Sequence, residues 1–251
     1  MRVLVAAGLD PSGGAGLLAD LEALRAAGAQ GWAVATALTA QGPRGARAME
    51  PVPAGLVLRQ IDALLDGARQ RPRALKTGML GSAENARALA ARFGAAPLAG
   101  VPLVVDPVLR SSSGLALLSD SRRRPPAAVL GPLLERAALA TPNWPELEAL
   151  AGRPLASEAE AVAAARALPA RAVLVKGGHR QGEPVDLLVR GRSVVRFRGR
   201  RRAGIARGTG CRLASAVAAL LARGARLEDA IRWAKRYVER YLDRALGEPL
   251  D

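Results

Sequence analysis

The chain has 251 residues, a formal net charge of +15, one cysteine and one histidine. A single cysteine excludes an internal disulfide, and so few Cys and His side chains nearly exclude a zinc site of the usual type. The opening residues, MRVLVAAGLDPSGG, contain an apolar run too short for a secretory signal or a membrane span, so we expect a soluble cytoplasmic protein with no membrane partner.

The positive charge is compatible with a nucleic-acid partner, an acidic substrate or an arginine-rich composition. Arginines are scattered over predicted helices, and the one dense cluster, RFRGRRRAGIAR at 196–207, leads into a glycine turn. A basic segment before a candidate anion site fits phosphate binding at least as well as DNA binding. Aromatic residues make up only 3% of the chain and offer no stacking platform, so we expect no nucleic-acid partner.

Short apolar, β-branched runs alternate with longer Ala/Leu segments of helical period, which predicts parallel strands joined by helical crossovers. Strands are predicted at 2–7, 31–38, 74–77, 101–105, 137–140, 172–176, 184–189 and 193–197. Helices are predicted at 14–27, 53–69, 83–95, 125–136, 144–151, 157–168, 209–223 and 227–246. The last two strands, separated by Arg-Gly-Arg, predict a hairpin. No segment resembles a linker, so one α/β domain is predicted over residues 1–251.

In an open parallel sheet, ligand sites gather at the carboxyl ends of the strands, so the residues after each strand are the candidates. The first strand is followed by GLDPSGGAGLLADLEAL, a glycine-rich turn that includes Gly8 and leads to Asp20. This stretch matches neither the Walker pattern nor the dinucleotide fingerprint, so it is either a ligand-binding loop or a plain strand-to-helix turn. Gln41, after the second strand, either reads the edge of a heterocyclic ring or is simply exposed.

Later strand ends carry charged residues. Asp106 follows the fourth strand and an Asn143-x-x-Glu146 turn follows the fifth, an arrangement that suits Mg²⁺ held partly through water. Equally, Asp106 caps a turn and Glu146 opens a helix, where acids are favoured. Lys176 ends the sixth strand before two glycines, where it either faces a polyphosphate or extends its ammonium to solvent.

The only cysteine follows a glycine turn, GTGC, at the start of a predicted helix. A lone thiol is most often a small buried apolar group. The first turn of a helix also favours anions and can lower the pKa of a thiol. In phosphoryl transfer such a turn stabilises the transferred group, and a neighbouring base accepts the proton of the attacking hydroxyl. Cys211 occupies the position of such a base.

Taken together, these stretches resemble the hydroxymethylpyrimidine/phosphomethylpyrimidine kinases of thiamine biosynthesis, a branch of the ribokinase-like superfamily. The matching stretches, in the family's order and across about residues 3–224, are AGLDPSGGAGLLADL, TALTAQ, KTGML, VVDPV, SSGLALL, TPNWPE, VLVKGGH and GTGC. The resemblance implies a three-layer α/β/α fold and a homodimer. It also implies transfer of phosphate from ATP, with Mg²⁺, to the hydroxymethyl group of 4-amino-5-hydroxymethyl-2-methylpyrimidine and, in many members, to its monophosphate.

The resemblance also implies roles by position. Gln41 would recognise the pyrimidine, with Asp20, Gly8 and Met79 in or beside its pocket. The residues that organise Mg²⁺ would be Asp106 and Glu146, and those that meet ATP and its phosphates would be Lys176, Thr209 and Asn143. Gly208 and Gly210 would form an anion hole, with Cys211 as the catalytic base.

The sequence departs from the family pattern around the thiol. The polar Asn-Thr-His that usually precedes the glycine turn is replaced by Ile205-Ala206-Arg207, and the small residue after the cysteine by Arg212. The usual Lys-Ser-Gly after the fourth strand appears as Ser112-Ser113-Gly114. One cation is therefore lost there, while two are gained around Cys211.

Two alternatives to the pyrimidine kinase stay open at this point. The first keeps the fold and phosphorylates pyridoxal or pyridoxine, although TALTAQ with DPSGGAG favours the pyrimidine branch. The second is a pyrimidine-binding protein with little or no catalysis, suggested by Arg207 and Arg212 beside the thiol.

Overall fold

The computed structural model describes residues 1–42, 44–111, 114–118, 124–178, 183–202, 204 and 206–247. Ser112, Ser113 and Ile205, where the sequence departs from the family pattern, lie outside the described residues. In the described part of the chain, no helix combines the length and apolar character needed to cross a membrane.

Within these residues the central sheet has nine strands in the order β3-β2-β1-β4-β5-β6-β7-β8-β9. They are β1 (Arg2–Leu9), β2 (Gln30–Gly42), β3 (Gly45–Pro51), β4 (Ala74–Thr77), β5 (Leu103–Val105), β6 (Ala137–Ala140), β7 (Val173–Val175), β8 (Val185–Arg190) and β9 (Ser193–Arg198). Neighbours from β2 to β7 pair in parallel, whereas β3, β8 and β9 add antiparallel pairs at the edges. The mostly parallel α/β sheet predicted from the alternating pattern is confirmed.

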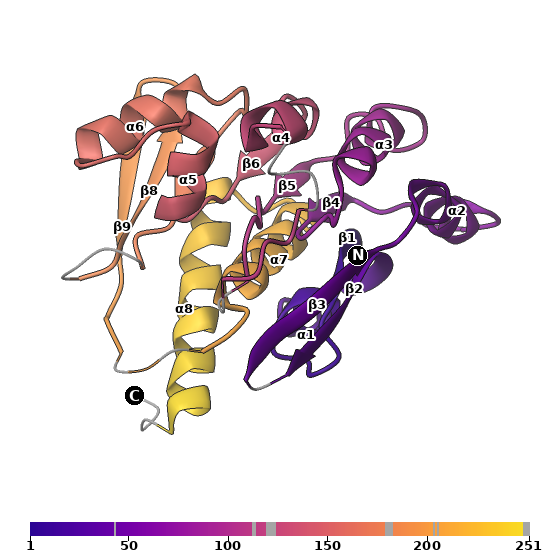
Figure 1. Cartoon of the computed structure of the whole chain (residues 1–251), viewed down its shortest axis with the longest axis horizontal. Coiled ribbons are helices and arrows are strands. Elements are labelled where there is room, and N and C mark those ends of the chain that lie inside the picture. Colours follow the sequence, from indigo (N-terminus) through magenta and orange to yellow (C-terminus); the bar gives the residue numbers. More distant parts are fainter. Residues whose placement is uncertain are drawn as a thin grey trace.

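Helices cover both faces of this sheet, which gives three layers (Figure 1). One face carries α1 (Gly16–Ala26), α7 (Thr209–Ala222) and α8 (Leu227–Leu246). The other carries α2 (Ala54–Leu65), α3 (Ala83–Phe93), α4 (Pro126–Leu134), α5 (Trp144–Ala151) and α6 (Glu158–Ala167). The three-layer α/β/α prediction is therefore correct.

The two cores follow from the side-chain alternation along the strands. In β1, Val3 and Val5 join the apolar cluster of α1, α7 and α8, whereas Leu4 and Ala6 join the opposite cluster. All four are fully buried. A strand buried on both faces reads as a continuous apolar run, which is why the sequence predicts β1 so clearly.

The hairpin formed by β2 and β3 differs from the prediction. The strand predicted at 31–38 continues to Gly42, and β3 was not predicted. The side chains of β3 are exposed or half-buried, so they show no apolar alternation, and the turn sequence GPRG reads as a loop. As a result Gln41, expected after a strand, lies within β2 near its end.

The helices occur where they were predicted, with shorter ends. The one predicted at 53–69 stops at Leu65, because Asp66 has an extended backbone (φ −65°, ψ 128°) and Gly67 follows at φ 60°. The remaining helices differ from their predicted ranges by a few residues at most.

Helix α2 provides a matched test of the core. Ile61 is fully buried in the cluster of α2 to α6, whereas Leu56 on the same helix is 43% exposed. Ile61→Ala should lower the free energy of unfolding by about 2–5 kcal/mol, because it removes buried methylene groups and leaves a cavity. Leu56→Ala should change it by less than about 0.5 kcal/mol. Urea unfolding followed by circular dichroism measures both, and equal losses would contradict the packing of α2.

Candidate active site

The carboxyl ends of the parallel strands lie next to one another, as the topology requires. Backbone hydrogen bonds join the exits of neighbouring strands: Gly78 N to Ala6 O (3.0 Å), Asp106 N to Thr77 O (2.9 Å), Thr141 N to Val105 O (2.9 Å) and Lys176 N to Pro142 O (2.8 Å). The helices that follow or adjoin these exits, α1, α5 and α7, begin at the same edge. Polar residues from distant parts of the sequence therefore meet there.

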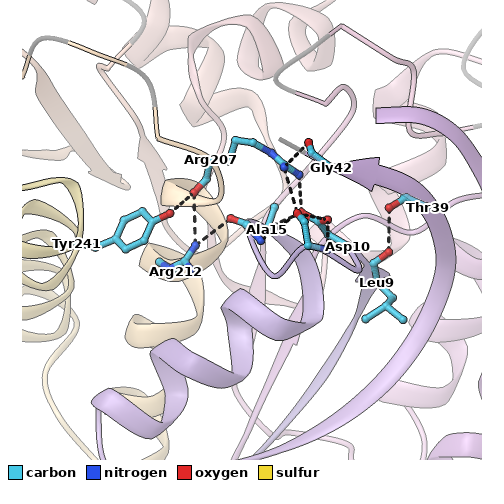
Figure 2. Close-up of polar contacts among 10 residues, drawn as sticks. Leu9, Asp10, Ala15, Thr39, Gly42, Arg207, Arg212 and Tyr241 are labelled. Atoms are coloured by element: carbon cyan, nitrogen blue, oxygen red, sulfur yellow. Dashed lines mark hydrogen bonds and ion pairs between the residues drawn. The ribbon is translucent and has the colours of Figure 1, made fainter. Parts of the chain in front are cut away.

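Asp10 organises the glycine-rich loop between β1 and α1, and the sequence analysis did not single it out. Its Oδ1 accepts hydrogen bonds from Ser12 N (3.0 Å) and Ser12 Oγ (2.7 Å), and its Oδ2 accepts one from Ala15 N (2.9 Å) (Figure 2). The side chain is 3% exposed. The Asp-Pro-Ser order is a recognised turn signal, so the sequence predicts a turn here. It does not predict which groups donate hydrogen bonds to Asp10.

Arg207 connects this loop to the turn before α7 and to the end of β2. Its guanidinium pairs with Asp10 and donates to Gly42 O (2.8 Å) and Ser12 Oγ (3.2 Å). Figure 2 shows the side chain reaching from the start of α7 across to Gly42 and Asp10. One arginine thus ties together three segments that surround the same edge of the sheet.

Arg212, in the first turn of α7, is buried and has a different set of partners. It donates to Gly14 O (3.0 Å) and to Glu22 Oε2 (2.6 Å), and its guanidinium lies 3.9 Å from the centre of the Tyr241 ring. Stacking on an aromatic ring suits the planar guanidinium. Arg212 therefore joins α1, α7 and α8 behind the glycine-rich loop.

Lys176 lies among the acidic residues that the sequence predicted at neighbouring strand ends. Its Nζ is 2.8 Å from Asp106 Oδ1 and 3.9 Å from Glu146 Oε2, and Thr141 Oγ1 also donates to Asp106 at 3.0 Å. Burial opposes ionisation of Asp106, but the charges of Lys176 and Lys76, together with the hydrogen bonds from Lys176 and Thr141, hold the pKa of Asp106 below its usual range. Lys176 and Asp106 therefore form an ion pair at neutral pH.

Glu146 also performs the structural role considered from the sequence. Asn143 caps α5 by accepting from Glu146 N (2.8 Å), and Glu146 Oε2 accepts in return from Asn143 N (2.7 Å), which completes a capping box. Burial raises the pKa of Glu146 to about 7, although Lys176 opposes the shift. The capping and site interpretations of Glu146 are compatible.

This set of oxygen donors fits a magnesium ion that is completed by a nucleotide. Mg²⁺ commonly takes one or two carboxylates and fills its remaining positions with water and phosphate oxygens. Asp106 and Glu146 supply two carboxylates around one ammonium. Among the described residues, no group of three or more His, Cys, Asp and Glu side chains forms a metal cluster.

Asp20 does not occupy the position expected of a substrate contact. Both of its oxygens accept from Lys76 Nζ, at 2.8 and 2.9 Å, and Ser215 Oγ donates at 2.8 Å. The side chains of Asp20 and Lys76 are 0% exposed. A carboxylate buried in this way supports the site from beneath rather than touching a ligand. Lys76 was missed because a lysine inside a short apolar strand gives no sign of its distant partner.

The glycine turn before α7, residues 208–211, is called here the anion turn. Gly208 adopts φ 71°, and a Cβ on it would lie 2.3 Å from Gly14 O, so glycine is required on two counts. A Cβ on Gly210 would lie 2.9 Å from Lys176 Nζ and 3.8 Å from Asp106 Oδ2. The start of α7 and Lys176 therefore bring backbone N–H groups and an ammonium to one point.

Cys211 is half-buried in the first turn of α7. Burial raises the pKa of its thiol to about 11, while the charge of Lys76 opposes the rise and the nearby carboxylate of Asp20 adds to it. The lowered pKa considered for a thiol at a helix start is therefore wrong as the net effect, because burial dominates. The thiol is protonated at neutral pH.

Of the residues expected around a ring-shaped substrate, Gly8 and Met79 are in contact, whereas Gln41 lies at the β2–β3 hairpin. Gly8 packs directly against Met79, whose Cε lies 1.8 Å from the position of an added Cβ. Met79 is 8% exposed and belongs to a small apolar cluster with Ala37 and Leu117. Gln41 borders a cavity of about 300 Å³ at the β2–β3 hairpin. A larger cavity, of about 570 Å³, is lined by residues around the ends of α1 and α7, away from the strand exits.

Sequence comparison links the chain to a kinase family. Residues 10–248 match the model of the phosphomethylpyrimidine kinase family. The chain is 42% identical over 241 residues to the hydroxymethylpyrimidine/phosphomethylpyrimidine kinase of Rhizobium meliloti (strain 1021), in an alignment that covers 92% of this chain and 86% of the relative.

Structural comparison agrees. The crystal structure of phosphomethylpyrimidine kinase from Clostridium difficile 630 is 32% identical, with a TM-score of 0.79 over 96% of this chain and 99% of that one. The pyridoxal kinase from Staphylococcus aureus in complex with AMP-PCP and pyridoxal is 28% identical, with a TM-score of 0.81 over 95% of this chain and 86% of that one. The fold is thus shared with two kinds of vitamin kinase.

The raised pKa of Cys211 predicts how the thiol reacts with iodoacetamide. Only the thiolate is alkylated, so the rate should rise about tenfold per pH unit between pH 8 and 10 instead of levelling off near pH 9 as a free thiol does. Mass spectrometry follows the reaction at a single site, because the chain has one cysteine. N-acetylcysteine serves as the exposed control. A rate that is already constant above pH 8 would contradict the buried, protonated thiol.

Proposed function

The chain belongs to the phosphomethylpyrimidine kinase family, and on this premise we propose that it transfers the γ-phosphate of ATP to the hydroxymethyl group of 4-amino-5-hydroxymethyl-2-methylpyrimidine and then to the resulting monophosphate. The enzyme is a phosphotransferase of thiamine biosynthesis. A related pyridoxal kinase has a structure in complex with AMP-PCP, an analogue of ATP. This complex supports ATP as the phosphate donor.

The observation that carries the residue roles is the meeting of Lys176, Asp106 and the anion turn at one point. In phosphoryl transfer the negative charge of the moving group is spread over its oxygens, and fixed positive groups aimed at it lower the barrier. We assign this task to Lys176 and to the backbone of Gly208, Thr209 and Gly210. Asn143 lies beside them, because it forms a backbone bridge with Lys176.

Mg²⁺ bound together with ATP would be held by Asp106 and Glu146, directly or through water, and supplies neutralisation of the phosphate charge. Asp106 is ionised at neutral pH, and its pair with Lys176 keeps it oriented. Glu146 is fixed at the same time by its capping box with Asn143. Neither carboxylate therefore has to be ordered when the nucleotide arrives.

On the acceptor side, Gln41 reads the edge of the pyrimidine with its paired donor and acceptor, and Gly8 and Met79 form the apolar floor. The absence of a side chain at Gly8 is what allows Met79 to lie there. Asp20 acts from below by holding α1 and α7 in register through Lys76 and Ser215.

Cys211 is our candidate for the catalytic base. A thiol with a pKa of about 11 is protonated at neutral pH, so it must first release its proton to water before the thiolate can accept the proton of the attacking hydroxyl. Lys76 is the positive charge that favours this loss. The role therefore predicts a strong pH dependence of turnover, which a purely structural cysteine does not.

Pyridoxal is the second candidate acceptor, because the structure is as similar to a pyridoxal kinase as to a phosphomethylpyrimidine kinase. A pyrimidine-binding protein with little catalysis is a third reading, suggested by Arg207 and Arg212 beside the thiol. We further propose that residues 1–251 act as one domain and that the protein is a cytoplasmic homodimer. The molar mass in solution, measured by light scattering, tests the dimer.

The decisive experiment measures ADP release with MgATP and, in separate reactions, hydroxymethylpyrimidine, its monophosphate and pyridoxal. We expect turnover on both pyrimidines, with a lower kcat/KM on pyridoxal. Turnover on pyridoxal alone would favour the second candidate. A folded protein that binds hydroxymethylpyrimidine but releases no ADP with any acceptor would establish the binding protein instead.

Variants of Cys211 test the base. Cys211→Ala should lower kcat by about 10²- to 10⁴-fold without a change in the unfolding midpoint, because the loss of a general base affects the transition state only. Cys211→Asp should retain more activity and should lose the rise of kcat with pH above 7, since a carboxylate is already ionised there. Unchanged turnover in Cys211→Ala would exclude the thiol as the base.

A further inference from the structure

Arg207 lies between the two halves of the proposed site. Arg207 directly precedes the anion turn, and its side chain reaches to Gly42, the neighbour of Gln41, and to Asp10 of the glycine-rich loop (Figure 2). Its backbone leads into the turn that carries Cys211. The guanidinium therefore lies beside the segment that carries Gln41, the proposed reader of the pyrimidine, and its main chain is joined to the turn of the proposed base.

The pair between Arg207 and Asp10 is exchangeable. Asp10 keeps three other donors, from Ser12 N, Ser12 Oγ and Ala15 N, if the guanidinium turns away. Nε of Arg207 is buried and has no hydrogen-bond partner within the described residues. The side chain as a whole is 17% exposed, so an oxyanion that meets the guanidinium reaches Nε once the guanidinium turns from Asp10. A donor left without an acceptor favours any oxyanion that can reach it.

The backbone of Arg207, in contrast, is fixed from two sides. Tyr241 Oη donates to Arg207 O at 2.9 Å, and Arg212 Nη1 lies 3.4 Å from the same oxygen. Tyr241 and Arg212 are themselves stacked. The side chain of Arg207 can therefore change partners without moving the anion turn on which catalysis depends.

The other cations of this edge are already engaged. Lys176 is paired with Asp106 and lies near Glu146, and Lys76 is fully buried against Asp20. Arg212 is 3% exposed and is held by Glu22, Gly14 and an aromatic ring. Of these described cations, Arg207 is the one whose carboxylate partner keeps three other hydrogen-bond donors when the ion pair is broken.

The two acceptors of the proposed reaction differ by one phosphate group. Near pH 7 this group is mostly a dianion. A guanidinium binds such a group side-on, through Nε and one Nη, more specifically than an ammonium does. We propose that Arg207 is the specificity-determining residue for the phosphorylated acceptor and pairs with its phosphate through Nε and Nη2 while Asp10 keeps the loop in place. This inference rests on the proposed function, because it concerns the second of its two acceptors.

The test compares wild type, Arg207→Met, Arg207→Lys and the charge control Arg87→Met, an exposed arginine of α3. For each, kcat/KM is measured with hydroxymethylpyrimidine and with its monophosphate, and binding of the monophosphate without ATP is measured by calorimetry. Arg207→Met should lower kcat/KM for the monophosphate by about 10- to 100-fold and weaken its binding by a similar factor. The change for the alcohol should stay below about threefold, Arg207→Lys should recover part of the loss, and Arg87→Met should resemble wild type.

Equal losses on both acceptors in Arg207→Met would overturn the inference and leave Arg207 a structural tie between loops. Unchanged kinetics and binding on the monophosphate would overturn it as well. Failure of the proposed function looks different, because the wild type would then phosphorylate neither pyrimidine. Calorimetry still decides the inference in that case, since weaker binding of the monophosphate to Arg207→Met supports it and equal binding rejects it.

Discussion

A buried pair of opposite charges lies where β4, α1 and α7 meet, and the site above depends on it. Lys76 Nζ is 2.8 Å from Asp20 Oδ1, with both side chains fully buried, and Ser215 adds a hydrogen bond. Taking two charges out of water is costly, and only close geometry with further hydrogen bonds offsets the cost. The pair thus restricts the positions of α1 and α7 against the sheet. The turns that begin those helices are restricted in the same way.

Those turns are the glycine-rich loop and the anion turn, which come from opposite ends of the sequence. Arg207 joins them through Asp10, and Arg212 joins them through Gly14. The acceptor and the donor of a group transfer must be held at a fixed separation, because small displacements of reacting atoms reduce rates strongly. Two arginines beside the thiol are therefore compatible with catalysis. The side chain of Arg212 joins the turns from behind the glycine-rich loop, and the position of Arg207 in the chain is held by its backbone oxygen, which accepts from Tyr241.

The sequence predicted the parts of the site that depend on local pattern. Asp106 and Lys176 stand out because each directly follows a short apolar strand, and parallel strands bring such positions to one edge. What it missed depends on distant packing: Lys76 and Asp20 are 56 residues apart, and β3 lacks an apolar face. The thiol pKa was misjudged for the same reason, because the helix start is visible in the sequence whereas burial is not.

The backbones of the two turns also approach each other closely. A Cβ at Gly208 would lie 2.3 Å from Gly14 O of the glycine-rich loop, and within that loop a Cβ at Gly16 would lie 2.3 Å from Gly8 O. Neither neighbour is a side chain that can turn aside. These glycines cannot be replaced one at a time, because each substitution would require the facing backbone to shift as well. A new acceptor preference on this fold therefore evolves through substitutions of the side chains that border the turns. Mutant libraries for altered vitamin kinases gain most when they spare these glycines and vary that border.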